Sequence, residues 1–223
     1  MLPILRAHNL ILDYQLKSNS IHALRDVTLT LDPGEMVCLF GASGSGKSTL
    51  LNVLAGLDLP DSGSVQVCGK AITDMSEDER TALRLNAIGM VFQDNNLIGQ
   101  FTARENIELI LRCQGAQSPK QTAVGLLDQL GVADLADRRP VDMSGGQRQR
   151  VGIARALAGD RPIVLCDEPT GALDRTNSDA LFMLLRRLTY STNVGVIIAT
   201  HDRVAETYTD RVLEITDGEL VAS

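Results

Sequence analysis

The segment from Met36 to Ala55, MVCLFGASGSGKSTLLNVLA, constrains the fold of this chain more than any other stretch. The apolar run Val37 to Phe40 predicts a buried strand, and leucines at helical spacing after Lys47 predict a helix. Between them lies the pattern G-x-x-x-x-G-K-S, in which glycines let backbone N–H groups converge on an anion. This order is typical of a phosphate-binding loop. Because strand and helix are both present, we prefer it to the alternative of a Gly/Ser linker.

The loop also supplies charges for a nucleotide. A helix N-terminus carries roughly half a positive charge. The ammonium group of Lys47 can bind β- and γ-phosphates, and the hydroxyl of Ser48 can ligate Mg²⁺. The stretch therefore predicts a site for a magnesium-bound nucleoside triphosphate.

Length and composition exclude several classes of protein. The chain has 223 residues, enough for one large domain or for a core with an inserted lobe. Its formal net charge of −7 argues against a nucleic-acid-binding surface. We see no signal-peptide pattern, and no apolar run approaches the roughly 18 residues that span a bilayer. We therefore expect a soluble protein that reaches a membrane only through a partner.

The cysteines Cys38, Cys68, Cys113 and Cys166 show no C-x-x-C spacing, which predicts reduced, buried, cytosolic thiols.

The order of the expected elements indicates an α/β fold. Alternating patterns predict half-exposed antiparallel strands over 4–14 and 22–31, and apolar runs predict strands over 65–68, 88–92, 163–167 and 194–200. Capping patterns at Ser76 and Thr102, the Ser118-Pro119 pair and Ser144 each open a helix, and a further helix is expected over 177–190. A hairpin over 211–222 closes the chain. Helices from 94 to 159 between strands predict a parallel-sheet core, 1–93 and 160–223, with an inserted helical subdomain, 94–159.

Two further strings carry candidate chemistry. The run Ile163 to Glu168 is an apolar strand that ends in two carboxylates; Asp167 can hold Mg²⁺, and Glu168 can polarise an attacking water. Alone, such a pair could be a solvated strand end. The string Met143 to Arg150 starts a helix with Ser144 as N-cap and two glycines that leave N–H groups open to an anion. Alone, this string could be an ordinary capped helix.

The string MSGGQRQR closely resembles the signature sequence of ATP-binding-cassette (ABC) ATPases, and further motifs of that family follow in order along the chain. The resemblance implies ATP and Mg²⁺ as cofactors. It implies catalytic roles for Glu168, the switch histidine His201 and Gln93, and metal contacts from Ser48, Gln93 and Asp167. It implies that the nucleotide is bound by Tyr14, which would stack on adenine, by the Walker A residues Gly41, Ala42, Ser43, Gly44, Ser45, Gly46, Lys47, Ser48 and Thr49, by the signature residues Ser144, Gly145, Gly146 and Gln147, and by Asp174 of the D-loop 172–174.

Two positions depart from the family pattern, Met143 for leucine and Cys166 for alanine, and both keep the apolar character. For Tyr14 a place in the strand core remains an alternative, and for His201 an ordinary surface position. The strings Gly56-Leu57-Asp58 and Asp167-Glu168-Pro169-Thr170-Gly171 look most like the lipoprotein-releasing and macrolide-export subfamily.

The resemblance implies a P-loop NTPase core with an antiparallel β subdomain and an inserted helical subdomain. It further implies an ATPase that forms a homodimer around two ATP molecules and drives transmembrane permease subunits from the inner, cytoplasmic face of the membrane. A first alternative is a membrane-tethered regulator of the cell-division type. A soluble ABC protein of translation or DNA repair and a P-loop kinase are further alternatives; the former usually has two cassettes or a long coiled coil, and the latter has no need of the signature.

Overall fold

The computed structural model describes residues 2–16, 19–171 and 173–221. Its strands are β1 (Leu5–Leu16), β2 (Asn19–Leu31), β3 (Met36–Phe40), β4 (Ser62–Val67), β5 (Lys70–Ala71), β6 (Ile88–Val91), β7 (Ile163–Asp167), β8 (Gly195–Thr200), β9 (Arg211–Thr216) and β10 (Glu219–Val221). Its α-helices are α1 (Lys47–Leu54), α2 (Glu77–Ala87), α3 (Ala103–Cys113), α4 (Pro119–Gln129), α5 (Gly145–Leu157) and α6 (Arg175–Thr192). This order confirms the predicted α/β class.

A six-stranded sheet lies at the centre of the molecule and has the strand order β10-β9-β3-β8-β7-β6. The strands β9, β3, β8, β7 and β6 are parallel, and β10 pairs antiparallel to β9. Because β8 lies between β3 and β7, the carboxyl ends of these three strands meet at one edge. The segments after Phe40, Asp167 and Thr200 are therefore neighbours, although they are far apart in the sequence.

Alternate side chains of the central strands enter two different apolar clusters. Cys38 and Cys166 belong to the cluster that includes residues of α3, α4, α5 and α6. Leu39 and Leu165 belong to the cluster that includes α1 and the antiparallel strands. A strand that is buried on both faces reads as a continuous apolar run, which explains why these strands were visible in the sequence.

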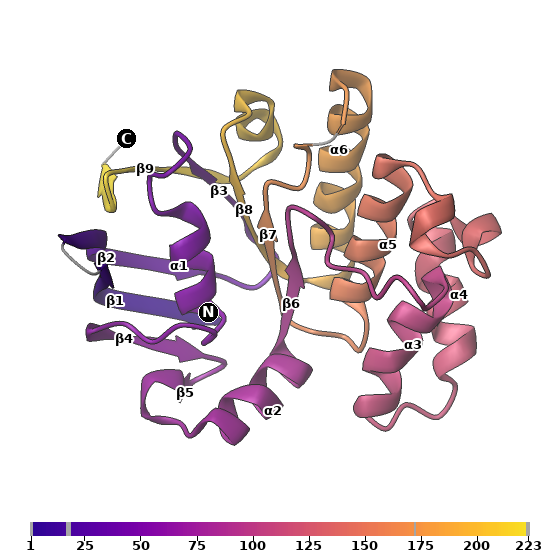
Figure 1. Ribbon diagram of the computed structural model, residues 1–223, viewed down its shortest axis with the longest axis horizontal. Coiled ribbons are helices and arrows are strands. Elements are labelled where there is room, and N and C mark those ends of the chain that lie inside the picture. The colour runs from indigo at the N-terminus through magenta and orange to yellow at the C-terminus, as the bar shows by residue number, and fades with distance from the viewer. Residues whose placement is uncertain (1, 17–18, 172, 222–223) are drawn as a thin grey trace.

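The second sheet is antiparallel and has the order β2-β1-β4-β5. Figure 1 shows β1, β2 and β4 at one end of the molecule and the helices α3, α4 and α5 at the opposite end. The strands β1 and β2 are longer than the alternation of apolar residues predicts, because their pairing continues through polar residues such as Gln15 and Ser20. The predicted end of the next strand at Cys68 is wrong: β4 ends at Val67, and Cys68 has φ 50°.

Local capping chemistry sets the helix starts. Capping boxes at Ser76, Thr102 and Ser144 open α2, α3 and α5 as the sequence predicts. The helix α6 begins earlier than the predicted residue 177, because the Asp174 carboxylate accepts a hydrogen bond from the Asn177 amide. Residues 172 and 222, which the sequence placed in the D-loop and the last hairpin, lie outside the described residues. None of the helices described is both long and apolar enough to cross a membrane.

The cysteines fall into two environments. Cys38 and Cys166 are buried, as predicted, and burial raises the pKa of each thiol to about 12. Cys68 and Cys113 are exposed, so the prediction of buried thiols is wrong for these two. Cys68 lies at the turn after β4 and Cys113 at the last position of α3, where the chain is no longer covered by the core.

Candidate functional site

A glycine-rich loop connects β3 to α1 and faces an open cleft of about 750 Å³. The loop reaches the helix through Gly46, which has φ 106° and caps α1 without a side-chain hydrogen bond. A Cβ atom at Gly46 would approach the Ala23 carbonyl oxygen to 2.7 Å, so this position requires glycine. Because Gly46 has no side chain that could cap α1, the first N–H groups of this helix remain available to bind an anion.

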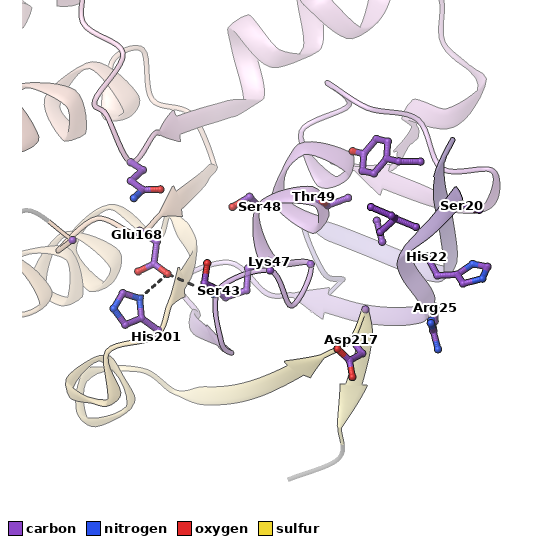
Figure 2. Close-up of a pocket in the computed structure, with 18 residues that line it drawn as sticks. Ser20, His22, Arg25, Ser43, Lys47, Ser48, Thr49, Glu168, His201 and Asp217 are labelled. Atoms are coloured by element: carbon purple, nitrogen blue, oxygen red, sulfur yellow. Dashed lines mark hydrogen bonds and ion pairs between the residues drawn. The ribbon is translucent and has the colours of Figure 1, made fainter. Parts of the chain in front are cut away.

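Lys47 lies inside this loop with 6% of its surface exposed. Its Nζ atom donates hydrogen bonds to the carbonyl oxygens of Gly41 and Ala42 at 2.8 and 2.9 Å. The same atom lies 3.6 Å from Oε1 of Glu168 (Figure 2). The ammonium group is therefore held between the phosphate-binding loop and the carboxylate that follows β7.

Glu168 points into the cleft as part of a small hydrogen-bonded group. Its Oε1 lies 3.0 Å from Nδ1 of His201 (Figure 2). Its Oε2 accepts a hydrogen bond of 3.2 Å from the Thr200 hydroxyl. The backbone of Glu168 has φ 46°, an uncommon value for a residue with a side chain. Strained geometry of this kind gathers at functional sites, because the surrounding structure must hold it.

Asp167 is partly buried, like its neighbour Glu168. Its Oδ1 atom is buried and has no hydrogen-bond partner among the described residues. Burial raises the pKa of this carboxyl group and the charge of Glu168 raises it further, whereas the nearby Ser48 hydroxyl and the charge of Lys47 act in the opposite direction. A buried carboxylate oxygen without a partner next to a hydroxyl suits a hard cation such as Mg²⁺. Mg²⁺ usually takes few protein ligands and completes its shell with water and phosphate oxygens, so the pair Ser48 and Asp167 fits that ion.

The remaining predicted residues of the first cleft lie around this centre. Gln93, just beyond β6, lines the same cleft as Lys47 and Glu168. Tyr14, on β1, lines the cleft at the side of Thr49, and 39% of its surface is exposed. This exposure does not agree with a place for Tyr14 in the strand core.

Sequence reasoning missed several residues that line the cleft, namely Ser20, Ile21, His22, Arg25, Asp217 and Gly218. Strand pairing could have found the first three, because an antiparallel hairpin sets Tyr14 opposite Ile21 and Asp13 opposite His22. The turn at Gly218 reaches the cleft by long-range bonds: Gly218 donates to the Ser45 carbonyl at 3.0 Å, and its own carbonyl accepts from the Arg25 amide at 2.8 Å. Hydrogen bonds between residues that are distant in the chain leave no local pattern in the sequence, so Gly218 could not be predicted to line the cleft.

The signature residues do not join the first cleft. Ser144, Gly145, Gly146 and Gln147 line a second cavity of about 320 Å³ together with Asp174, and among the described residues the two cavities share no lining residue. The Ser144 hydroxyl accepts a hydrogen bond from the Gln147 amide at 3.3 Å, and the Gln147 side chain accepts one from the Ser144 amide at 2.9 Å. The N-terminus of α5 thus lines a separate cavity within the same chain.

Comparison with known proteins gives the same architecture. The family model described as ABC transporter matches residues 24–171. An uncharacterized ABC transporter ATP-binding protein, MJ0796 of Methanocaldococcus jannaschii, is 40% identical over 97% of this chain and 95% of its own length. The lipoprotein-releasing system ATP-binding protein LolD of Saccharophagus degradans is also 40% identical, over 98% of this chain and 96% of that protein.

The macrolide export ATP-binding/permease protein MacB of Rhodopseudomonas palustris is 44% identical over 94% of this chain. This chain spans only 32% of the length of that protein. A solved dimeric structure of MJ0796, in a post-hydrolysis state with ADP and Pi, superposes with a TM-score of 0.92 and 38% identity over 98% of this chain and 97% of the solved chain. The matched residues include the phosphate-binding loop and the two carboxylates at the end of β7, and the chain therefore belongs to the ABC transporter family of ATPases.

Proposed function

We propose that this chain is the ATP-hydrolysing subunit of a membrane transport complex. The observation that carries the proposal is the arrangement of Lys47 and Glu168, whose charged atoms lie 3.6 Å apart across a phosphate-binding loop. The loop and Lys47 bind the β- and γ-phosphates, and Glu168 orients the attacking water. Phosphoryl transfer needs chiefly such positioning and stabilisation of charge.

The other residues of the first cleft have supporting roles in this proposal. Ser48 and Asp167 would hold Mg²⁺, with Gln93 as a further oxygen ligand; the ion neutralises charge on the phosphate oxygens when it is bound. His201 keeps Glu168 oriented through the bond at 3.0 Å. Tyr14 stacks on the base of the nucleotide, a contact that accepts any base because it reads no hydrogen-bonding pattern.

The second cavity supports action by a homodimer. The signature residues at the N-terminus of α5 line a cavity that, within the part of the chain that the structure describes, shares no lining residue with the cleft of Lys47. We propose that Ser144 to Gln147 and Asp174 contact the nucleotide of the partner copy. The solved structures of MJ0796, which match over 98% of this chain, are dimeric.

In this proposal the chain has a core of residues 1–93 and 160–223 and an inserted helical subdomain of residues 94–159. The helical subdomain transmits the opening of the dimer to transmembrane permease subunits. The chain would therefore lie at the cytoplasmic face of the membrane and act in export or in transmission of force across it. The likeness to LolD and to MacB, whose names refer to lipoprotein release and macrolide export, supports this class of partner.

The pair Lys47→Ala and Glu168→Gln tests the proposed roles. Lys47→Ala should weaken ATP binding, whereas Glu168→Gln should bind ATP normally, accumulate an ATP-bound dimer and lose turnover at least about a hundredfold, or about 2.7 kcal/mol of barrier. Phosphate release measures turnover, calorimetric titration measures ATP binding, and size-exclusion chromatography with ATP measures accumulation of the dimer. Lys70→Ala and Glu214→Gln, which make the same chemical changes at exposed positions, are the controls. Normal turnover in Glu168→Gln would contradict the proposal.

A further inference from the structure

The side chain of Tyr14 is tied to a residue that is distant in the sequence. Its hydroxyl donates a hydrogen bond of 3.0 Å to Oδ2 of Asp58, in the loop that follows α1. Burial raises the pKa of Tyr14, and the bond to Asp58 and its charge raise the pKa further, so the phenol stays a neutral donor. The bond joins the antiparallel sheet to the segment that follows the phosphate-binding helix.

The carboxylate of Asp58 is itself held in place. The carbonyl oxygen of Asn52, in the last turn of α1, accepts hydrogen bonds from the amides of Leu57 at 2.9 Å and Asp58 at 3.4 Å. The Asn52 side-chain amide lies 3.5 Å from the same Oδ2 atom that accepts from Tyr14. The acceptor is therefore fixed to the helix whose first residue is Lys47.

A second acid of the same loop fixes the backbone of the strand rather than the ring. Asp61 accepts a hydrogen bond of 2.7 Å from the Asp13 amide, and its own amide donates to the Ile11 carbonyl at 2.8 Å. With the backbone on the N-terminal side of Tyr14 held in this way, the remaining freedom is rotation of the Tyr14 side chain. The side chain of Asp58 restricts that rotation through its hydrogen bond from the Tyr14 hydroxyl, and the Thr49 hydroxyl lies close to the same phenol group, where it lowers the Tyr14 pKa.

We propose that Asp58 is a positioning residue for the nucleotide base, because it holds the Tyr14 ring by its hydroxyl edge and leaves a ring face available for stacking. The inference rests on the proposed function, in which Tyr14 stacks on the base. The ring lines the cleft beside Thr49 and is 39% exposed, so it is held and yet accessible. An unheld ring would lose rotational freedom on stacking, and the hydrogen bond removes that cost before the nucleotide arrives.

A comparison of MgATP with magnesium tripolyphosphate, which has no base, tests this role by calorimetric titration. Tyr14→Phe and Asp58→Ala should each weaken MgATP binding about three- to tenfold, the range of one net hydrogen bond, with no loss for tripolyphosphate. The double variant should be no weaker than either single variant, because both remove the same bond. Asp58→Asn keeps an acceptor oxygen and should retain most of the affinity. Asp78→Ala, which removes an exposed charge outside the cleft, is the control.

The outcomes separate the inference from the proposed function. Equal weakening of MgATP and tripolyphosphate would show that Asp58 only supports the phosphate-binding loop, and the inference would be overturned. Additive losses in the double variant, or no loss in Tyr14→Phe and Asp58→Ala, would overturn it as well. Tyr14→Ala checks the base contact itself and should weaken MgATP binding roughly tenfold. If Tyr14→Ala has no effect, the stacking role in the proposed function fails along with the inference.

Discussion

Asp167 and Glu168 are adjacent residues with different environments. Asp167 ends β7 and keeps one buried carboxylate oxygen without a partner among the described residues. Glu168 leaves the strand with φ 46° and bonds to His201 and Thr200. The sequence analysis expected the two side chains to separate, with Asp167 near the metal and Glu168 near the water. The structure adds that Glu168 also lies 3.6 Å from Lys47, so both carboxylates border the same phosphate-binding loop.

The residue Asp167 should limit the stability of the metal-free protein. Burial raises its pKa, so its contribution to stability falls as pH rises above the pKa of an unfolded aspartate. Asp167→Asn removes the buried charge and should raise the melting temperature at pH 7 by about 2–4 °C, which corresponds to ~1 kcal/mol for a chain of this size. The same variant should lose Mg²⁺-dependent ATP binding.

Thermal unfolding in the presence of a chelator measures the first effect, and titration with ATP and Mg²⁺ measures the second. Asp32→Asn, at an exposed position of the turn between β2 and β3, should change neither property. A lower melting temperature for Asp167→Asn would show that the carboxylate stabilises the metal-free fold, contrary to this account.

At the scale of elements, the contact between β6 and α5 depends on Gly89. A Cβ atom at this position would overlap the carbonyl oxygen of Ala156, a backbone atom that cannot rotate away. Gly89→Ala should therefore destabilise the protein by several kcal/mol, about the 2–5 kcal/mol of a severe core change. Because neither glycine nor alanine is charged, this loss of stability would report packing alone.

Gly125 provides the matched comparison for Gly89. It lies inside α4, and, apart from its chain neighbours and the nearby backbone of that helix, no heavy atom of the described residues lies within 4 Å of a Cβ placed there. Gly125→Ala should stabilise the protein by about 0.5–1 kcal/mol, because alanine loses less entropy than glycine on forming a helix. Urea unfolding of both variants measures the difference. Equal effects of the two substitutions would mean that the packing of β6 on α5 does not penalise a Cβ atom at Gly89.

The elements differ in how far the sequence could predict them. The helix starts at Ser76, Thr102 and Ser144 were visible because a capping box joins residues three positions apart. The strands of the parallel sheet were visible because burial on both faces leaves an apolar run. The bond from Tyr14 to Asp58 and the turn at Gly218 were not visible, because each depends on how two distant segments meet.

At the scale of the whole molecule, the predicted nucleotide contacts divide into two cavities. Lys47, Glu168 and Tyr14 line one cavity, whereas Gly146 and the other signature residues line the second. The family resemblance supplied the full set of residues, but no sequence pattern could show that the set is divided within one chain. In the dimer that we propose, each site would take one part from each copy, and this division is the observation that supports that arrangement.

The division predicts complementation between two inactive variants, Lys47→Ala and Gly146→Asp. The second variant puts a carboxylate where the partner's γ-phosphate should lie, and its Cβ would meet the side-chain atom Cδ2 of Leu173 at 3.0 Å. If Lys47 of one copy acts with Gly146 of the other, a mixed dimer has one doubly damaged site and one intact site. If both residues act within one copy, every site in the mixture keeps a defect.

Random exchange makes about half of the dimers mixed, and each mixed dimer has one intact site, so the mixture could recover roughly a quarter of wild-type ATPase activity. Recovery would be smaller if the two sites must act together, because the coupling between sites then lowers the turnover of a half-damaged dimer. Phosphate release is measured for the mixture and for each variant alone, after wild-type turnover has been established for the isolated chain. Native mass spectrometry confirms that mixed dimers form, and a dimer with one Lys47→Ala copy and one wild-type copy shows whether a single site suffices. If it does, and the mixture still shows no recovery, Ser144 to Gln147 do not act on the partner's nucleotide.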